Sequence, residues 1–133
     1  MIIDAKHAVM GRLASYAAKQ LLKGNPVAIF NAENVIITGD PLEIKGKYLQ
    51  RRRRGSPQHG PFFPRRPDLI LRRTIRGMVD YKKEKGRAAM KKLRIHIGVP
   101  QDLDKKEAIT LKKEIRTNFI TLGELAKALG WQG

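Results

Sequence analysis

The sequence contains no cysteine, and its 12 acidic residues are outnumbered by 28 lysines and arginines. Without cysteine, disulfides and thiolate metal sites are excluded, and the composition fits a reducing compartment. No apolar run approaches the roughly 20 residues that a membrane-spanning helix requires. The apolar stretch at the N-terminus ends at the charged Asp4, so it is too short for a signal peptide. We therefore expect a cytoplasmic protein with no membrane partner.

The sequence also lacks the motifs of common catalytic sites. The segment over residues 4–11 holds one glycine, so it is neither a dinucleotide fingerprint nor a phosphate-binding P-loop. The three histidines are scattered without a second ligand at metal spacing, and Ser15 has no elbow motif around it. We expect no catalytic residue, no cofactor, no metal and no small-molecule substrate.

Two carboxylates leave one alternative open. Asp4 and Asp40 each follow a predicted strand, where a pair of carboxylates could bind magnesium or act as nucleophile and acid. The chain would then be a basic-surfaced, metal-dependent enzyme that acts on nucleic acid or nucleotides. The simpler interpretation is that Asp40 caps a helix and that Asp4 ends a strand.

The positive charge is concentrated in the middle of the chain. Residues 41–94 carry eighteen basic and four acidic groups, a net charge of +14, whereas residues 1–40 and 95–133 each carry a net charge of +1. A chain of 133 residues, 41% of them hydrophobic, is long enough for one domain with an apolar core. This distribution indicates a balanced globule with one basic surface, which is typical of a nucleic-acid-binding protein.

The most basic stretch, residues 45–66, contains no aspartate or glutamate. Neighbouring arginines lie within a Debye length of about 8 Å and repel one another, so an ordered stretch needs negative charge from outside. A polyphosphate backbone is the most obvious source, and a solvated basic loop is the alternative. We expect the nucleic-acid contacts of this stretch to be made by Lys45, Lys47, Arg51, Arg52, Arg53, Arg54, Arg65 and Arg66.

Further residues extend the predicted contact surface. His59, Phe62 and Phe63 could stack on unpaired bases, although the two phenylalanines could instead anchor the loop to the core. A stripe of Arg12, Tyr16, Lys19 and Lys23 on the first helix fits phosphates and solvent equally well. A second contact face is expected from Arg72, Arg73, Arg76, Lys82, Lys83, Arg87, Lys91 and Lys92.

Short apolar runs at residues 2–3, 27–30, 35–37 and 94–97 are typical of strands buried in a parallel sheet. Helical spacing predicts helices over residues 10–22, from Pro41 into the arginine run, from Pro67, across 82–93 and over 121–129. We therefore expect an α/β fold, namely a three-layer α/β/α domain with a small parallel sheet of about four strands. Residues 1–133 would form a single domain, with a basic excursion at 45–66 and a C-terminal arm and helix at 101–133.

Apolar stripes and caps give these helices their expected orientation. Thr121 and Glu124 form a capping box, and Gly130 is placed to end the last helix, which we expect to be docked. The segment over 101–116 has a weak pattern and is expected to be an extended arm or loop. Leu42, Ile44 or Lys45, Tyr48 and Leu49 would continue the helix from Pro41 into the arginine run. The expected apolar stripe of the helix from Pro67 is Leu71, Ile75, Met78 and Val79, and the expected buried face of the last helix is Leu122, Leu125, Ala126 and Leu129.

Several short segments together resemble the universal large-subunit ribosomal protein L13 family, in the right order over most of the chain. They are GRLAS at residues 11–15, NAE at 31–33, ITG at 37–39 and RGM at 76–78. Residues 51–67 and the ending over 122–131 are similar to the archaeal and eukaryotic branch, and the lack of a longer C-terminal extension favours an archaeal member. One departure is Asp80, which stands where many members have a proline.

The resemblance implies a three-layer α/β/α fold and no catalysis. It implies binding to large-subunit (23S-type) ribosomal RNA beside neighbouring ribosomal proteins, with a structural role in subunit assembly and translation. A regulatory RNA-binding role outside the ribosome is a further alternative, although no residue signals one.

Overall fold

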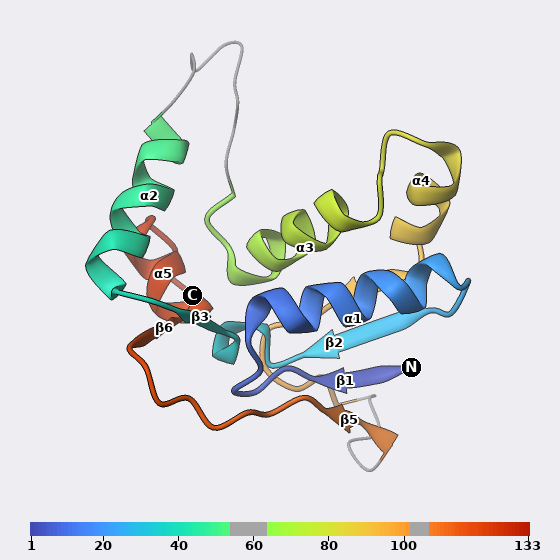
Figure 1. Cartoon of the computed structure of the whole chain (residues 1–133), viewed down its shortest axis with the longest axis horizontal. Helices are drawn as coiled ribbons and strands as arrows, with labels where there is room; N and C mark the ends of the chain where they lie inside the picture. Colours follow the sequence, from blue (N-terminus) through green and yellow to red (C-terminus); the bar gives the residue numbers. More distant parts are fainter. Residues whose placement is uncertain (54–63, 102–106) are drawn as a thin grey trace.

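Four short parallel strands form the main sheet of the computed structural model, which describes residues 1–53, 64–101 and 107–133 (Figure 1). Their order is β4-β2-β1-β5, so the first strand lies inside the sheet and the last strand lies at an edge. Ile3 of β1 pairs with Ile29 on one side and with Ile109 on the other. The strands are β1 (Ile2–Asp4), β2 (Val27–Phe30), β4 (Leu93–Ile95) and β5 (Ile109–Thr110).

The helix α1 (Met10–Leu22) follows β1 and packs on β2, on α3 (Pro67–Met78) and on α4 (Glu84–Met90). Its predicted apolar face is confirmed, because Leu13, Ala14, Ala17, Ala18 and Leu21 are buried. Gly24 ends the helix region with a φ of +92°, as predicted. This mixed arrangement of a parallel sheet and five helices confirms the expected α/β fold, consistent with three α/β/α layers.

The run at residues 35–37 was expected in the parallel sheet, and this expectation is wrong. The strand β3 (Ile36–Thr38) pairs antiparallel with β6 (Phe119–Thr121) in a second, two-stranded sheet. The short 3-10 helix η1 (Ala32–Asn34) causes this, because it turns the chain after β2, with Asn31 at a φ of +60°. The fourth parallel strand is β5, within a segment predicted to be an arm without regular structure.

The helix α2 (Pro41–Arg53) begins as predicted and carries the first arginines in its last turn. The backbone N–H of Leu42 donates to Asp40 Oδ1 at 3.0 Å, which confirms Asp40 as the cap. Tyr48 is buried, whereas Leu42 is 77% exposed. Ile44 follows Leu42 by two residues, and at 100° per residue it faces nearly the opposite side.

The apolar stripe of α3 is confirmed at Leu71 and Ile75, whereas Met78 was wrongly expected to be buried and is 45% exposed. The helix ends at Met78, and the next side chain, Val79, enters the core instead. Ile70 is a further buried residue of the same helix.

The C-terminal helix α5 (Leu122–Ala128) is docked as predicted. Thr121 Oγ1 accepts from the N–H of Glu124 at 3.2 Å, and the four expected apolar side chains are buried. The helix packs on η1, α2 and α3, and Gly130 follows it with a φ of +111°. In the described ranges no polar side chain is fully buried, and none of the helices there is long and apolar enough to cross a membrane.

Candidate nucleic-acid interface

The predicted basic stretch begins on α2. Lys47 is exposed and Lys45 is half-buried, while Arg52 and Arg53 belong to the last turn of the helix. This helix therefore leads the chain from the second sheet out to the arginine run, as Figure 1 shows. The remaining predicted contacts of the run, namely Arg54, His59, Phe62 and Phe63, lie outside the described residues.

Arg51 is oriented by an aromatic partner. Its guanidinium carbon lies 5.1 Å from the centroid of the Tyr48 ring, a geometry suited to a cation–π contact. Burial raises the pKa of Tyr48 above its usual value, and the nearby positive charge of Arg51 opposes that rise. The last turns of α2 therefore present Arg51 in a defined direction.

Arg65 and Arg66 lie where the described chain resumes, just before α3. Arg66 Nη2 is 3.0 Å from Asp68 Oδ2, and the Arg66 side chain is still 57% exposed. The guanidinium of Arg65 lies beside Gly130, after the end of α5. Both arginines are exposed and hence accessible to a partner.

The three predicted arginines of α3 surround one hollow of about 250 Å³, together with Pro64 and Leu69. The Arg72 guanidinium is directed toward the end of α4 and the start of β4. Its two terminal nitrogens donate to the carbonyl oxygens of Met90 and Leu93, each at 3.3 Å. The guanidinium carbon of Arg76 lies 4.4 Å from the centroid of the Tyr81 ring. Arg72 thus joins α3 to the end of α4, while Arg76 is half-buried beside an exposed tyrosine.

The lysines and arginine around α4 are exposed. Lys83 Nζ lies 3.6 Å from Asp80 Oδ2, and Lys92 Nζ donates to the carbonyl oxygen of Gly24 at 3.0 Å. No side-chain partner within the described ranges is recorded for Lys82, Arg87 or Lys91. Part of the predicted second face therefore lies together on α3 and α4. Arg72 and Lys92 differ from the rest, because they donate hydrogen bonds to backbone carbonyls of Met90, Leu93 and Gly24.

Asp4 and Asp40, the two carboxylates of the enzyme alternative, accept hydrogen bonds from nearby residues. Asp4 Oδ1 accepts from the N–H of Lys6 and from Asn31 Nδ2, each at 3.0 Å, and Asp40 caps α2. Across the described part of the chain, no group of three or more histidine, aspartate or glutamate side chains is arranged to hold a metal.

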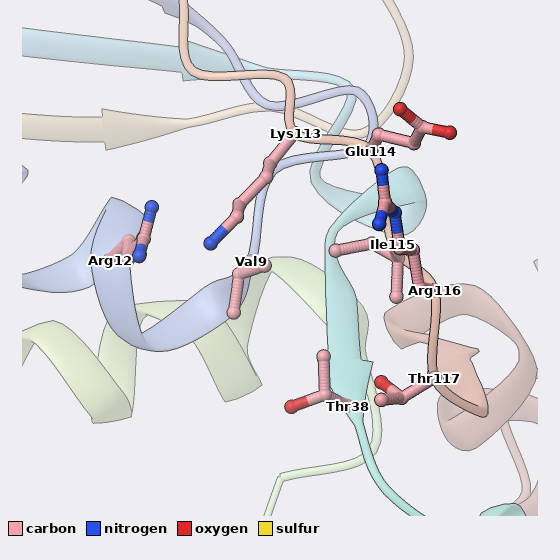
Figure 2. Close-up of a pocket in the computed structure, with 8 residues that line it drawn as sticks. All are labelled: Val9, Arg12, Thr38, Lys113, Glu114, Ile115, Arg116 and Thr117. Atoms are coloured by element: carbon pink, nitrogen blue, oxygen red, sulfur yellow. The ribbon is translucent and has the colours of Figure 1, made fainter.

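Sequence reasoning missed a basic hollow of about 590 Å³ beside the start of α1. Its cations are Arg12 of α1 and Lys113 and Arg116 of the arm between β5 and β6 (Figure 2). The arm carries mixed charges, so its composition gave no signal. The arm lies beside the start of α1 because β5 pairs with β1 and β6 pairs with β3. The sequence pattern did not predict these two pairings.

Comparison with known proteins decides the family. A sequence model described as Ribosomal protein L13 matches residues 1–102. The chain belongs to this family. Similar relatives include the protein named large ribosomal subunit protein uL13 in Methanopyrus kandleri, which is 46% identical over 98% of this chain and 87% of the relative. The protein of that name in Methanocaldococcus jannaschii is 48% identical over 97% of this chain and 96% of its own length.

Membership of the L13 family confirms the resemblance found in the sequence. The protein is therefore a ribosomal protein and not an enzyme, and the metal-dependent alternative is dropped. The relatives are archaeal, in agreement with the branch that residues 51–67 and 122–131 indicated. Since they align over nearly the whole chain, the relatives share the region of the C-terminal arm and α5 that follows residue 102.

Proposed function

We propose that the protein is a structural constituent of the large ribosomal subunit, where it binds 23S-type ribosomal RNA through its basic surface and supports subunit assembly and translation. The observation that carries this proposal is the nearly full-length similarity to relatives that are each named as a large ribosomal subunit protein. We further propose that it works in the cytoplasm, beside neighbouring large-subunit proteins.

The basic surface supports an RNA partner. Residues 41–94 carry a net charge of +14, with four acidic side chains against eighteen basic ones, and ion pairs join Arg66 to Asp68 and Lys83 to Asp80. Arginine side chains suit RNA because the planar guanidinium can bridge two phosphate oxygens or stack on a base. The described contacts that we assign to the first RNA face are the half-buried Lys45, the exposed Lys47, Arg65 and Arg66, and the ring-oriented Arg51.

The second proposed face lies on α3 and α4. Arg73, Arg76, Lys82, Lys83, Arg87 and Lys91 are its contacts, whereas Arg72 and Lys92 support it from beneath through backbone carbonyls. Base stacking by His59, Phe62 and Phe63 stays a prediction, as do the contacts of Arg52, Arg53 and Arg54.

We also infer that residues 1–133 act as one domain. One cluster of buried side chains runs from Ile3 to Leu129, so the N-terminal strand and the C-terminal helix share a core. Such a body would present both faces to RNA as a rigid unit.

Sedimentation of a native lysate tests the proposal. A structural constituent is expected to run with the large subunit at a ratio of one copy per subunit and to stay there through a wash at moderate salt. Material that runs free, or that leaves the subunit at low salt, would contradict the proposal and favour a regulatory RNA-binding role outside the ribosome.

A further inference from the structure

The basic hollow beside α1 is lined by three segments that are distant in the sequence. Val9 and Arg12 come from the start of α1, Thr38 from the end of β3, and Lys113 and Arg116 from the arm before β6. In Figure 1 the arm runs along the bottom of the view and the C-terminal end of α2 lies at the top. The arm that lines the hollow is therefore separated in this view from the end of α2 that carries the first arginines.

The cations of the hollow lack an internal counterion. Arg12, Lys113 and Arg116 are exposed, and no side-chain hydrogen bond or ion pair is recorded for them within the ranges described. Figure 2 shows the side chains of Arg12 and Lys113 extending toward the same space, while the carboxylate of Glu114 points away from both. Like charges that converge in this way repel one another, and an anion between them removes the repulsion.

The backbone anchors these side chains on both flanks. The arm begins at β5, which pairs with β1, and it ends at β6, which pairs with β3. Between the strands, the N–H of Lys113 donates to the carbonyl oxygen of His7 at 3.4 Å, and the N–H of Gly39 donates to that of Asn118 at 2.8 Å. The convergence of cations is therefore part of the fold and does not depend on a free tail.

We propose that this hollow binds phosphate groups of a second ribosomal RNA segment, separate from the segment at the arginine-rich stretch. The inference rests on the proposed function for the identity of the nucleic acid. The lining supplies cationic donors from Arg12, Lys113 and Arg116 and hydroxyl groups from Thr38 and Thr117, beside the apolar Val9 and Ile115. Glu114 also lines the hollow, but its carboxylate points away from Arg12 and Lys113. Such a surface suits a phosphate backbone better than a peptide, whose side chains would need apolar pockets. The protein would thereby link two RNA segments.

A charge-matched pair of variants tests the proposal in the full-length protein. We compare the double variant Arg12→Gln, Lys113→Gln with the double variant Lys112→Gln, Lys127→Gln. Each removes two positive charges from exposed side chains, but neither Lys112 of the arm nor Lys127 of α5 lines the hollow. The measurement is affinity for deproteinised large-subunit ribosomal RNA over a salt titration.

The hollow variant is expected to bind roughly tenfold more weakly at moderate salt and to lose about 1.5 to 2 from the log–log salt slope, because two phosphate contacts are removed. The control variant should stay within about twofold of the unaltered protein. If both variants behave alike, the hollow is not an RNA contact and the proposal is overturned.

Site-directed RNA cleavage separates failure of this inference from failure of the proposed function. Because the chain has no cysteine, an iron–EDTA group can be tethered to a single introduced one, at Thr117→Cys beside the hollow or at Gln50→Cys on α2. The two positions are expected to cleave different segments of the bound RNA. Cleavage from Gln50→Cys alone would overturn the second contact only, whereas no cleavage from either position would overturn both proposals.

Discussion

Arg72 and Arg76 lie one turn apart on α3 and carry the same charge, yet their environments differ. The guanidinium of Arg72 donates to two carbonyl oxygens at the end of α4 and the start of β4, and that of Arg76 lies over the Tyr81 ring. Helical spacing predicted that both would project from the apolar stripe. It could not predict that one of them reaches backbone carbonyls contributed by residues 90 and 93.

Arg72→Gln is therefore expected to lower the free energy of unfolding by about 1–2 kcal/mol, since hydrogen bonds from a charged group to backbone acceptors are lost. Arg87→Gln removes the same charge from an exposed site on α4 and should change stability by less than about 0.5 kcal/mol. Urea unfolding followed by circular dichroism measures both. Equal stability of the two variants would mean that the Arg72 contacts contribute nothing to the fold.

For single basic residues, the sequence predicted surface exposure better than it predicted which residues lie together in space. The cations around α4 are on the surface because a short helix with one buried face leaves its other positions to solvent. The basic hollow was missed because Lys113 and Arg116 stand in a segment of balanced charge. Only the pairing of its two flanking strands brings that segment to Arg12.

The corner between α3 and α4 is formed at Asp80, where the resemblance had implied a proline. Asp80 has a φ of +56°, and its carbonyl oxygen accepts from the N–H of Lys83 at 3.1 Å. Proline is fixed near a φ of −65°, so it cannot occupy this corner as it stands. Gly86 of α4 then passes directly beneath the carbonyls of Val79 and Asp80.

A methyl group at Gly86 would meet those two carbonyl oxygens, which belong to the backbone and cannot rotate away. Gly86→Ala is therefore expected to cost roughly 2–4 kcal/mol in the free energy of unfolding. Gly77→Ala, in α3, has open space around the new Cβ and should be neutral or stabilising by up to about 1 kcal/mol. Thermal unfolding of the two variants is the measurement, and a stable Gly86→Ala protein would show that the corner relaxes.

Helices were predicted well and strand partners poorly, for a physical reason. Helix signals such as the Thr121 cap and the apolar face of α1 are local, because the contacts that they reflect lie within about four residues. Strand pairing is not local. Residues 35–37 have the composition of an inner strand, but the chain turns at Asn31 and β3 pairs with β6 instead. The remaining edge of β1 pairs with β5.

For the whole molecule, the net charge of +16 predicts how binding responds to salt. If about six phosphates are neutralised, the log–log slope should be roughly −4 to −5. Changing Arg51, Arg52, Arg53 and Arg54 together to glutamine should weaken RNA binding and flatten this slope by up to about 3. The melting temperature should stay nearly unchanged, because arginine side chains are rarely part of an apolar core.

The same four positions changed to lysine provide the control, since the charge and hence the slope are retained while the planar fork is lost. Filter binding over a salt series measures the slopes, and calorimetry measures the melting temperature. Unfolding of the glutamine variant would show that the arginines serve the fold, and an unchanged slope would show that they do not contact phosphate.

The order of strands has a consequence for the protein's own synthesis. β1 is synthesised first, but its outer edge pairs only with β5, at residues 109–110. In the same way, β3 has no strand partner until β6, at residues 119–121, has been synthesised. Pairings between segments so far apart form slowly, and an open strand edge is a site for wrong partners. A nascent chain thus keeps two unsatisfied edges until its last quarter has emerged from the translating ribosome. Only a chain that extends past β6 has both the closed sheet and the basic hollow, so the proposed RNA contact at the hollow would be the last one to form.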